Sequence, residues 1–377
     1  MKVFFDGMIY SWQKEGGIHR YSEELISECG KNKEMETTLL MRLPSYYVSP
    51  KRGVVIKNIA YFRYVPDFLF SIFRKIFSPI NKMLFENYFK KISTGIFHST
   101  YYTTYKNLKI PQILTIYDMI YERFTYCSNS RGAKRFIANK RKCIMNADAI
   151  ICISNATKKT LTDIYKIDDE KISVIHLGIS ENFISDTISN IKLRDISDKP
   201  YFLFVGFRKL YKNFIFFIEA FSKWDKNKNY NILVAGGGKL TEEEHLTLKK
   251  FGIEKQVKLL GFVNEKDLKY MYKNSIAFVY PSLEEGFGLP ILEAIGSRGE
   301  VIASDIDAFR EIGEDMIRYF NPRKIESLIN TLEQSTSERH TDEELEKRAK
   351  YVISKYSWKE CVNKTIGVYK KVQKNKK

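Results

Sequence analysis

Three carboxylates and two glycines stand together in the stretch SLEEGFGLPILEA, residues 282–294. The run before it, Ser275–Tyr280, has the apolar pattern of a buried strand, and the run from Leu289 onward predicts a helix. Gly286 and Gly288 leave backbone N–H groups accessible at the start of that helix, where anionic or hydroxyl-bearing ligands bind favourably. The stretch therefore predicts a ligand-binding junction between a strand and a helix.

Two of the three carboxylates could reach such a ligand at different depths. Glu285 lies in the loop, and Glu293 lies eight residues further on, about one turn into the helix. A carboxylate that accepts two hydroxyl hydrogen bonds suits the diol of a ribose or a hexose. The alternative is that these acids merely cap the helix N-terminus.

A second loop supplies positive charge. The predicted strand Tyr201–Val205 runs into VGFRKLYKNF, which contains Gly206, Arg208 and Lys212. Arginine offers a bidentate fork to phosphate, and lysine offers a point charge. A solvated basic loop is the alternative, but together with the acidic loop it predicts phosphate-binding chemistry in the second half of the chain.

Several common kinds of site are missing from the sequence. Residues 236–238 are three glycines after a predicted strand, but they lack the spacing of a dinucleotide fingerprint, and no Gly-x-x-x-x-Gly-Lys-Ser/Thr loop occurs. No Asp-x-Asp motif and no Ser-His-Asp or Cys-His arrangement is evident, and no metal site is expected. The cysteines are odd in number and scattered, which favours a reducing compartment over a disulfide framework. They are Cys29, Cys127, Cys143, Cys152 and Cys361.

The first half of the chain carries two weaker signals. GGIHRY, residues 16–21, places Gly16, Gly17 and His19 at a predicted helix start, and Asp118 follows a predicted strand in TIYDMIYERF. An ordinary helical role for His19 is the alternative.

Composition limits the class of protein. The 377 residues favour two domains, and the net charge of +17 favours nucleic acid, anionic lipid or phosphorylated small molecules as partners. Basic residues concentrate in 61–91, 131–142 and 370–377, where a solvated surface is the alternative interpretation. No signal peptide and no membrane-spanning run is recognisable, so we expect a cytoplasmic protein unless a surface retains it.

Predicted strands alternate with helices in both halves, which indicates two doubly wound parallel α/β domains. Residues 180–199 are polar and irregular and form the predicted linker. Ligands bind such sheets outside the carboxyl ends of the strands, so two facing edges would form a deep cleft. The predicted strands are 2–5, 37–41, 95–98, 112–116, 149–153, 172–176, 201–205, 230–235, 257–260, 275–280, 301–304 and 317–320. The main predicted helices are 18–29, 214–224, 241–251, 265–273, 289–295, 323–334 and 342–355.

The aromatic segment 61–91 interrupts the first domain. Leu69, Ile72, Phe73 and Ile76 form an apolar stripe flanked by basic residues, and Pro79 is predicted to start a second helical piece. A basic amphipathic helix rich in Phe is typical of a membrane interface. A helix that packs on its own sheet has the same periodicity, so both interpretations stay open.

Taken together, these motifs resemble family 4 of the retaining glycosyltransferases, which have the GT-B fold of two facing Rossmann-like domains. Glu285 and Glu293 stand in the two places of the family's Glu-x7-Glu motif, and the resemblance runs over nearly the whole chain in the same order. The supporting segments are 16–21, 97–102, 115–124, 147–161, 172–180, 204–214, 259–275 and 356–369.

The resemblance implies a role for each candidate residue. The catalytic group would be Glu285, which holds the donor hexose, with Arg208 and Lys212, which bind and stabilise the leaving diphosphate. Glu293 would hold the ribose, and Val263 would lie near the base. The remaining donor-binding residues would be Gly206, Gly286, Phe287, Gly288 and Leu289, while Gly16, Gly17, His19 and Asp118 would border the diphosphate and the acceptor.

The function implied is transfer of a hexose, with retention, from a nucleotide sugar to a glycan or lipid-linked acceptor in surface polysaccharide synthesis, such as O-antigen. GDP-mannose is the favoured donor, a UDP-sugar is the alternative, and no separate cofactor is expected. The implied domains are 1–180 for the acceptor and 199–355 for the donor, with 356–377 crossing back to the first. Two other hypotheses remain: a basic nucleic-acid-binding protein, and an inactive protein that binds sugar nucleotides. An anionic membrane is a further expected partner, and nucleic acid is not.

Three positions depart from the commoner family pattern. Tyr211 stands where many members have Arg, so Arg208 is expected to supply that cation. Tyr117 stands where many have His before Asp118, and Glu300 replaces a frequent proline.

Overall fold

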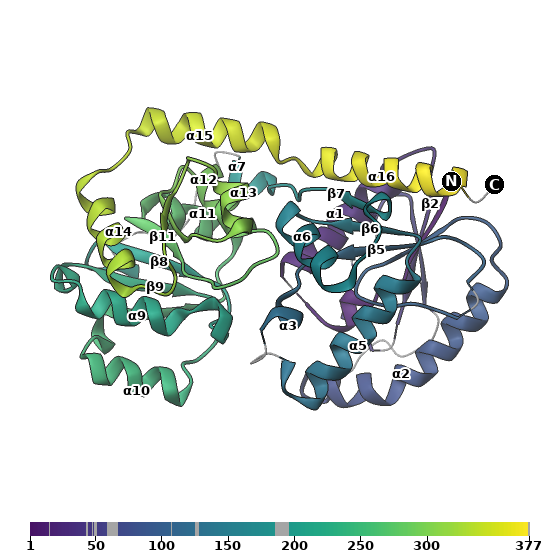
Figure 1. Cartoon of the computed structure of the whole chain (residues 1–377), viewed down its shortest axis with the longest axis horizontal. Helices are drawn as coiled ribbons and strands as arrows, with labels where there is room; N and C mark the ends of the chain where they lie inside the picture. Colours follow the sequence, from purple (N-terminus) through teal and green to yellow (C-terminus); the bar gives the residue numbers. More distant parts are fainter. Residues whose placement is uncertain are drawn as a thin grey trace. The chain divides into compact units, whose positions relative to one another are not determined.

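The chain divides into two compact units in the computed structural model (Figure 1). The structure describes residues 1–14, 16–42, 44–46, 48, 51–58, 67–106, 108–124, 128–184 and 196–375. We call residues 1–178 with 358–377 unit 1, and residues 179–357 unit 2. Most of the predicted linker, residues 185–195, lies outside the described residues.

Unit 1 is built on a parallel sheet of seven strands in the order β3-β2-β1-β4-β5-β6-β7. Central strands such as β4 are buried along their whole length, because helices cover both faces of a doubly wound sheet. The strand order reverses between β1 and β4, and ligands of such sheets bind at this switch point. The strands are β1 Lys2–Phe5, β2 Glu36–Met41, β3 Val54–Asn58, β4 Ile96–Ser99, β5 Gln112–Ile116, β6 Ala149–Cys152 and β7 Ile172–Val174.

The helices of unit 1 begin where the sequence supplies caps. The hydroxyls of Ser130 and Ser154 accept hydrogen bonds from the backbone N–H groups three residues on, which fixes the first turns of α5 and α6. The helices are α1 Gly17–Lys31, α2 Asp67–Lys90, α3 Ile120–Arg123, α5 Arg131–Asn146, α6 Asn155–Tyr165 and α16 Trp358–Asn375, with short 3-10 turns η1 Ile9–Ser11 and η2 Asp169–Lys171.

The last helix, α16, packs against α1 and β6 of unit 1 (Figure 1). The fully buried His98 on β4 links it to the sheet: Nδ1 lies 2.5 Å from the Tyr369 hydroxyl, and Nε2 lies 2.9 Å from Thr115 Oγ1. Burial lowers the pKa of His98 to about 3, so the ring is neutral at physiological pH.

Unit 2 repeats the same plan with six parallel strands in the order β10-β9-β8-β11-β12-β13. Its switch point lies between β8 and β11, the two strands that precede the basic and acidic loops. Phe202, Phe204 and Phe217 are among the buried side chains that join the sheet to its helices. The strands are β8 Tyr201–Val205, β9 Asn231–Ala235, β10 Val257–Gly261, β11 Ala277–Tyr280, β12 Val301–Ser304 and β13 Arg318–Phe320.

Two helices of unit 2 start with complete capping boxes, in which Thr241 pairs with Glu244 and Thr341 with Glu344. The helices are α7 Glu181–Ile184, α9 Phe214–Lys223, α10 Glu242–Phe251, α11 Glu265–Asn274, α12 Leu289–Gly296, α13 Asp307–Gly313, α14 Ile325–Ser337 and α15 Asp342–Lys355. Short 3-10 turns lie at η3 Leu210–Lys212, η4 Asn227–Asn229 and η5 Glu254–Gln256.

The prediction that Pro79 starts a new helical piece was wrong, because α2 continues through it. A proline removes one backbone donor, and packing over the rest of a long helix offsets that loss. Phe70, Phe85 and Phe89 are buried in the unit, so α2 packs on its own domain. The opposite side of α2 leaves a row of apolar side chains exposed, Ile72, Ile76, Ile80 and Met83, at 51, 56, 40 and 55%.

Glu300, which replaces a frequent proline, has a structural role. Its carboxylate is 3% exposed and accepts hydrogen bonds from Arg318 Nη1 at 2.9 Å and from the His340 backbone N–H at 2.9 Å. The His340 ring nitrogen Nδ1 lies 2.8 Å away. The glutamate thus ties the start of β12 to β13 and to the segment before α15.

Candidate active site

The basic and acidic loops meet at the switch point of unit 2. Lys212 Nζ lies 2.5 Å from Glu285 Oε1 and donates to the Tyr280 hydroxyl at 3.0 Å. Ser282 Oγ also donates to Glu285 Oε1, at 2.7 Å. Burial, and then the charge of Glu285, raises the pKa of Tyr280 well above its usual value, so that hydroxyl stays protonated. Lys212 and Glu285 side chains are 15 and 11% exposed, which makes this a largely desolvated charge pair.

Arg208 lies on the same loop but is fixed by other partners. Its Nε donates to Glu244 Oε1 at 2.8 Å, and its Nη2 donates to the Lys239 carbonyl at 2.7 Å. The third nitrogen, Nη1, is buried without a hydrogen-bond partner among the described residues. A guanidinium held on two sides, with one nitrogen still available to donate, is preorganised for a further acceptor such as a phosphate oxygen.

Glycines bring the backbone close to this guanidinium. Gly236, Gly237 and Gly238 all have positive φ after β9, and a Cβ on Gly237 would lie 2.5 Å from Arg208 Nη1. Gly206, at φ 113°, follows β8 with open space around its Cβ position. The edge therefore presents a glycine-lined shelf beside Arg208.

The acidic loop enters α12 through a residue that has to be glycine. Gly288 has φ 127°, and its Cβ position lies 3.3 Å from the Phe309 ring. Phe287 is 3% exposed and packs edge-on against Tyr356 at 6.2 Å, so its side chain anchors the loop while its backbone stays at the edge. Leu289 is also buried.

Glu293 lies inside unit 2, at 6% exposure. The Tyr272 hydroxyl donates to its Oε2 over 3.4 Å, a long contact. The two carboxylates of the motif thus differ in setting: Glu285 is paired with a cation, and Glu293 contacts a neutral hydroxyl.

Two exposed aromatic residues at this edge were missed by the sequence reasoning. Phe207 follows Gly206 and is 67% exposed, and Phe262 precedes the half-buried Val263 and is 74% exposed. Exposed aromatic faces beside a charged site are able to stack on a planar ligand. The sequence signal for both residues was a phenylalanine directly after a glycine at the end of a strand.

The candidate residues of unit 1 lie at the carboxyl edge of its sheet. Gly16, with φ 136°, caps α1, and Gly17 is its first residue. The His19 ring packs edge-on against Tyr10 at 5.3 Å. Asp118 follows β5, and its Oδ1 accepts the Ile120 backbone N–H at 3.1 Å.

Asp6 is a buried organiser of this edge that the sequence reasoning did not identify. Its carboxylate accepts hydrogen bonds from the Thr100 backbone N–H at 3.0 Å, from Thr100 Oγ1 at 2.7 Å and from the Thr103 hydroxyl. Asp6 follows β1 and Thr100 follows β4, so the carboxylate bridges the switch point. An acidic residue directly after the first predicted strand was the sequence signal that could have identified Asp6.

The basic run 131–142 is not uniformly solvated, contrary to one interpretation of it. Lys140 is fully buried on α5, where Nζ lies 3.1 Å from Glu122 Oε2 and donates to the Asp118 carbonyl at 2.5 Å. Lys140 therefore holds the loop that carries Asp118. Tyr117 is also buried, and its hydroxyl donates to the Thr100 carbonyl at 2.9 Å.

The cysteine thiols of the described residues are poor nucleophiles. Burial raises the pKa of Cys29, Cys143, Cys152 and Cys361 to about 12 in each case. Cys127 lies outside the described residues. Within the described ranges, no three His, Cys, Asp or Glu side chains gather as a metal cluster.

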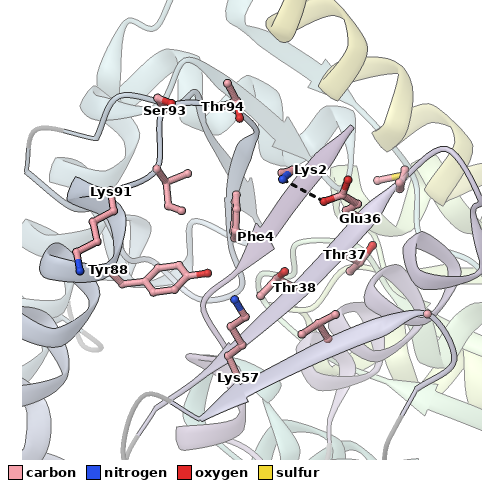
Figure 2. Close-up of a pocket in the computed structure, with 14 residues that line it drawn as sticks. Lys2, Phe4, Glu36, Thr37, Thr38, Lys57, Tyr88, Lys91, Ser93 and Thr94 are labelled. Carbon is pink, nitrogen blue, oxygen red and sulfur yellow. Dashed lines mark ion pairs between the residues drawn. The ribbon is translucent and has the colours of Figure 1, made fainter.

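A separate pocket of about 550 Å³ opens between the end of α2 and strands β1 to β3 (Figure 2). Lys57 and Tyr88 point toward one another across it, with Lys57 Nζ 5.6 Å from the ring centre, while Lys2 pairs with Glu36 at 3.3 Å. Lys2 and Glu36 begin their strands, so the pocket reaches the amino ends of the sheet, away from the candidate site.

Two family models match the chain over consecutive segments. The model described as "Glycosyltransferase Family 4" matches residues 15–183, and the model described as "Glycosyl transferases group 1" matches residues 187–352. The two matches correspond closely to the two units.

Known proteins resemble the chain in sequence and in fold. The O-antigen chain mannosyltransferase RfbU of Salmonella typhimurium is 31% identical over 192 residues, which are 49% of this chain. The chain spans 51% of that relative's length. Sucrose-phosphate synthase of Thermosynechococcus elongatus matches with a TM-score of 0.75 at 16% identity, covering 98% of each chain. Anabaena HepE, solved with UDP and glucose, matches with a TM-score of 0.72 at 14% identity, covering 97% of this chain and 98% of that one. These likenesses confirm the GT-B fold class.

Proposed function

Since the chain belongs to glycosyltransferase family 4, we propose that it transfers a hexose from a nucleoside diphosphate sugar to a saccharide or lipid-linked saccharide, with retention of configuration. The contact between Lys212 Nζ and Glu285 Oε1, 2.5 Å at the switch point of unit 2, supports this most directly. It pairs a cation suited to diphosphate with a carboxylate suited to sugar hydroxyls.

In the proposed reaction, unit 2 binds the donor. Arg208 and Lys212 contact the diphosphate, Glu285 and the backbone of Gly286–Gly288 contact the hexose, and Glu293 contacts the ribose. As the bond from the anomeric carbon to the diphosphate oxygen breaks, negative charge grows on that oxygen and the two cations stabilise it. The acceptor hydroxyl attacks from the same face and gives its proton to the departing diphosphate oxygen, so configuration is retained.

Mannose is the proposed sugar. RfbU, named as an O-antigen chain mannosyltransferase, supports that choice and a role in surface polysaccharide synthesis. The HepE structure with UDP and glucose supports a UDP-sugar as the alternative. GDP-mannose is therefore tested against UDP-glucose, UDP-galactose and UDP-N-acetylglucosamine.

The experiment measures thermal stabilisation and slow donor hydrolysis with each nucleotide sugar. We expect one donor to raise the melting temperature and to be hydrolysed. Lys212→Ala should lower the hydrolysis rate by about 100-fold, because it removes a preorganised cation from the developing charge. Lys209→Ala, at an exposed lysine of the same loop, is the matched control. If no donor stabilises the protein, the proposed function is wrong.

We also propose that α2 brings unit 1 to an anionic membrane that carries the acceptor, at its inner face. The exposed row Ile72, Ile76, Ile80 and Met83 lies on the side of α2 opposite its buried phenylalanines, and Lys75, Lys82 and Lys90 are exposed beside it. Apolar side chains flanked by lysines suit an interface of acyl chains and anionic headgroups. No helix among the described residues has the length and apolarity to cross a bilayer.

Vesicle flotation tests this contact. The double substitution Ile76→Ser and Ile80→Ser should abolish most binding to vesicles that contain phosphatidylglycerol. Ile164→Ser, at a residue of α6 that is 41% exposed, is the control and should bind as the unmodified protein does. Equal binding by all three proteins would exclude α2 as the contact.

A further inference from the structure

Aromatic side chains from separate loops and helices gather at the carboxyl edge of unit 1. Trp12 comes from the loop after β1, Tyr101 from the loop after β4, Tyr121 from α3 after β5, and Phe136 from α5. The ring centres lie 5.7 Å apart for Trp12 and Tyr101, 6.1 Å for Tyr101 and Phe136, and 4.9 Å for Phe136 and Tyr121. The row of four aromatic rings thus spans the switch point of this sheet, where doubly wound folds bind ligands.

Trp12 is the most exposed member of this cluster. It is 41% exposed, whereas the other two tryptophans of the chain, Trp224 and Trp358, are 2 and 8% exposed. The guanidinium of Arg74 lies 3.7 Å from the Trp12 ring centre, and its Nη1 donates to the Ser11 carbonyl at 3.3 Å. Arg74 comes from α2, so a second element holds the indole in place through a cation–π contact.

Polar groups surround the rings. One carboxylate oxygen of Asp118 accepts a hydrogen bond from the Ile120 N–H. The pKa of the Tyr101 hydroxyl is raised chiefly by burial and then by the negative charge of Asp118. That hydroxyl therefore stays protonated and able to donate. Ser11 Oγ and Gln13 Oε1, on either side of Trp12, are buried without a hydrogen-bond partner among the described residues. A buried polar atom without a hydrogen bond destabilises the fold, and a ligand hydroxyl that reaches it would remove that cost.

We propose that Trp12, Tyr101, Tyr121 and Asp118 form a saccharide-binding platform on which a hexose ring of the acceptor stacks against the indole. Its apolar C–H face lies on Trp12, and its hydroxyls reach Asp118 and Tyr101. A bare lipid offers no hydroxyl to the Asp118 carboxylate or the Tyr101 hydroxyl, whereas a saccharide offers both an apolar face and hydroxyls. The role of the bound saccharide as acceptor rests on the proposed transferase function, whereas saccharide binding itself does not.

Intrinsic fluorescence tests the platform without any donor. Linear trisaccharides of mannose, glucose and N-acetylglucosamine are titrated at millimolar concentration. We expect at least one to shift and quench the emission of the unmodified protein, because Trp12 passes from water to a sugar face. Trp12→Phe should remove that signal and keep saccharide binding in calorimetry, because a phenyl ring still stacks. Unchanged emission with all three sugars would overturn the proposal.

Kinetics give the second readout. Trp12→Ala should raise the KM for the acceptor about tenfold, the equivalent of one lost aromatic contact, and leave donor hydrolysis unchanged within about twofold. Trp12→Phe should restore most of the loss. An unchanged acceptor KM in Trp12→Ala would contradict the platform. If the unmodified protein hydrolyses no donor, the transferase function is refuted, and the fluorescence result still stands.

Discussion

The proposed donor site depends on a single nitrogen of Arg208. Its Nε and Nη2 are held by Glu244 and the carbonyl of Lys239, while Nη1 has no partner among the described residues. Glu244 is also the capping-box residue of α10, so the start of a helix and the aim of the guanidinium depend on the same carboxylate. A lysine would not reproduce this arrangement, because it lacks the planar fork.

Neighbouring glycines allow a matched test of this site. Gly237→Ala would place a Cβ 2.5 Å from Arg208 Nη1 and 2.9 Å from the Gly206 carbonyl, so donor affinity should fall about tenfold as the guanidinium is displaced. Gly238→Ala meets nothing within 4 Å and has a similar positive φ, so it should cost about 1 kcal/mol of stability and leave donor affinity unchanged. Calorimetry with the donor and urea unfolding separate the two effects. Equal donor affinity in both variants would contradict the role of Nη1.

Lys140 and Glu122 form a buried pair whose side chains are 0 and 3% exposed. Lys140→Met should destabilise unit 1 by about 3–5 kcal/mol, because it leaves a carboxylate buried without its partner. Adding Glu122→Gln removes that charge and should recover much of the loss in urea unfolding. A double variant no more stable than Lys140→Met would show that the pairing is not the cause.

At the scale of elements, α16 is joined to the sheet through a histidine that must remain neutral. The pKa of His98 is about 3 in the folded state and about 6.5 when unfolded. The unfolded chain therefore binds an extra proton as pH falls below 6.5, and stability falls with it. The loss is about 1.4 kcal/mol for each pH unit down to the folded value.

Replacing the ring isolates that contribution. His98→Gln should be less stable than the unmodified protein near pH 7 but should lose less stability on going to about pH 5, by about 2 kcal/mol. Urea unfolding at both pH values measures the difference, and the carboxylates contribute equally to both proteins. Identical pH dependence would mean that His98 is not held neutral.

Patterns within one element were predicted well from the sequence. The continuous apolar runs of β5 and β12 gave strands with the bounds that the structure has, and α15 was likewise predicted from its first to its last residue. The edge strand β3 was missed, because its run VVIKN is short and ends in polar residues. The short helix α13 was missed because seven residues hardly establish a period.

Contacts between distant segments could not be predicted from patterns within one element. Lys140 reads as one of six basic residues in 131–142, and its burial depends on Glu122 and on the carbonyl of Asp118, which only the folded chain brings near. The residues of the proposed platform around Trp12 come from three separate segments, after β1, after β4 and after β5. For the acidic loop, the strand and helix were predictable, while its pairing with Lys212 required the strand order.

At the scale of the whole molecule, a net charge of +17 makes any membrane binding sensitive to salt. Each lysine or arginine near an anionic surface contributes about 1 kcal/mol at low ionic strength. Vesicle binding should therefore weaken steeply as salt rises and then level off at the contribution of the exposed apolar row of α2. With Ile76→Ser and Ile80→Ser, binding should fall to zero at high salt. A residual plateau in that variant would show that another surface holds the membrane.

Lys212 already has a counter-ion within the protein, because it is paired with Glu285. An incoming phosphate does not meet a bare ammonium; it has to exchange places with a carboxylate that is 11% exposed. A ligand that brings only phosphate separates the pair and leaves Glu285 with the Ser282 hydroxyl but without its cation, whereas one that also brings hydroxyl donors satisfies both groups. This exchange would make binding selective. Free phosphate and nucleoside diphosphates without a sugar would bind more weakly than a complete sugar nucleotide.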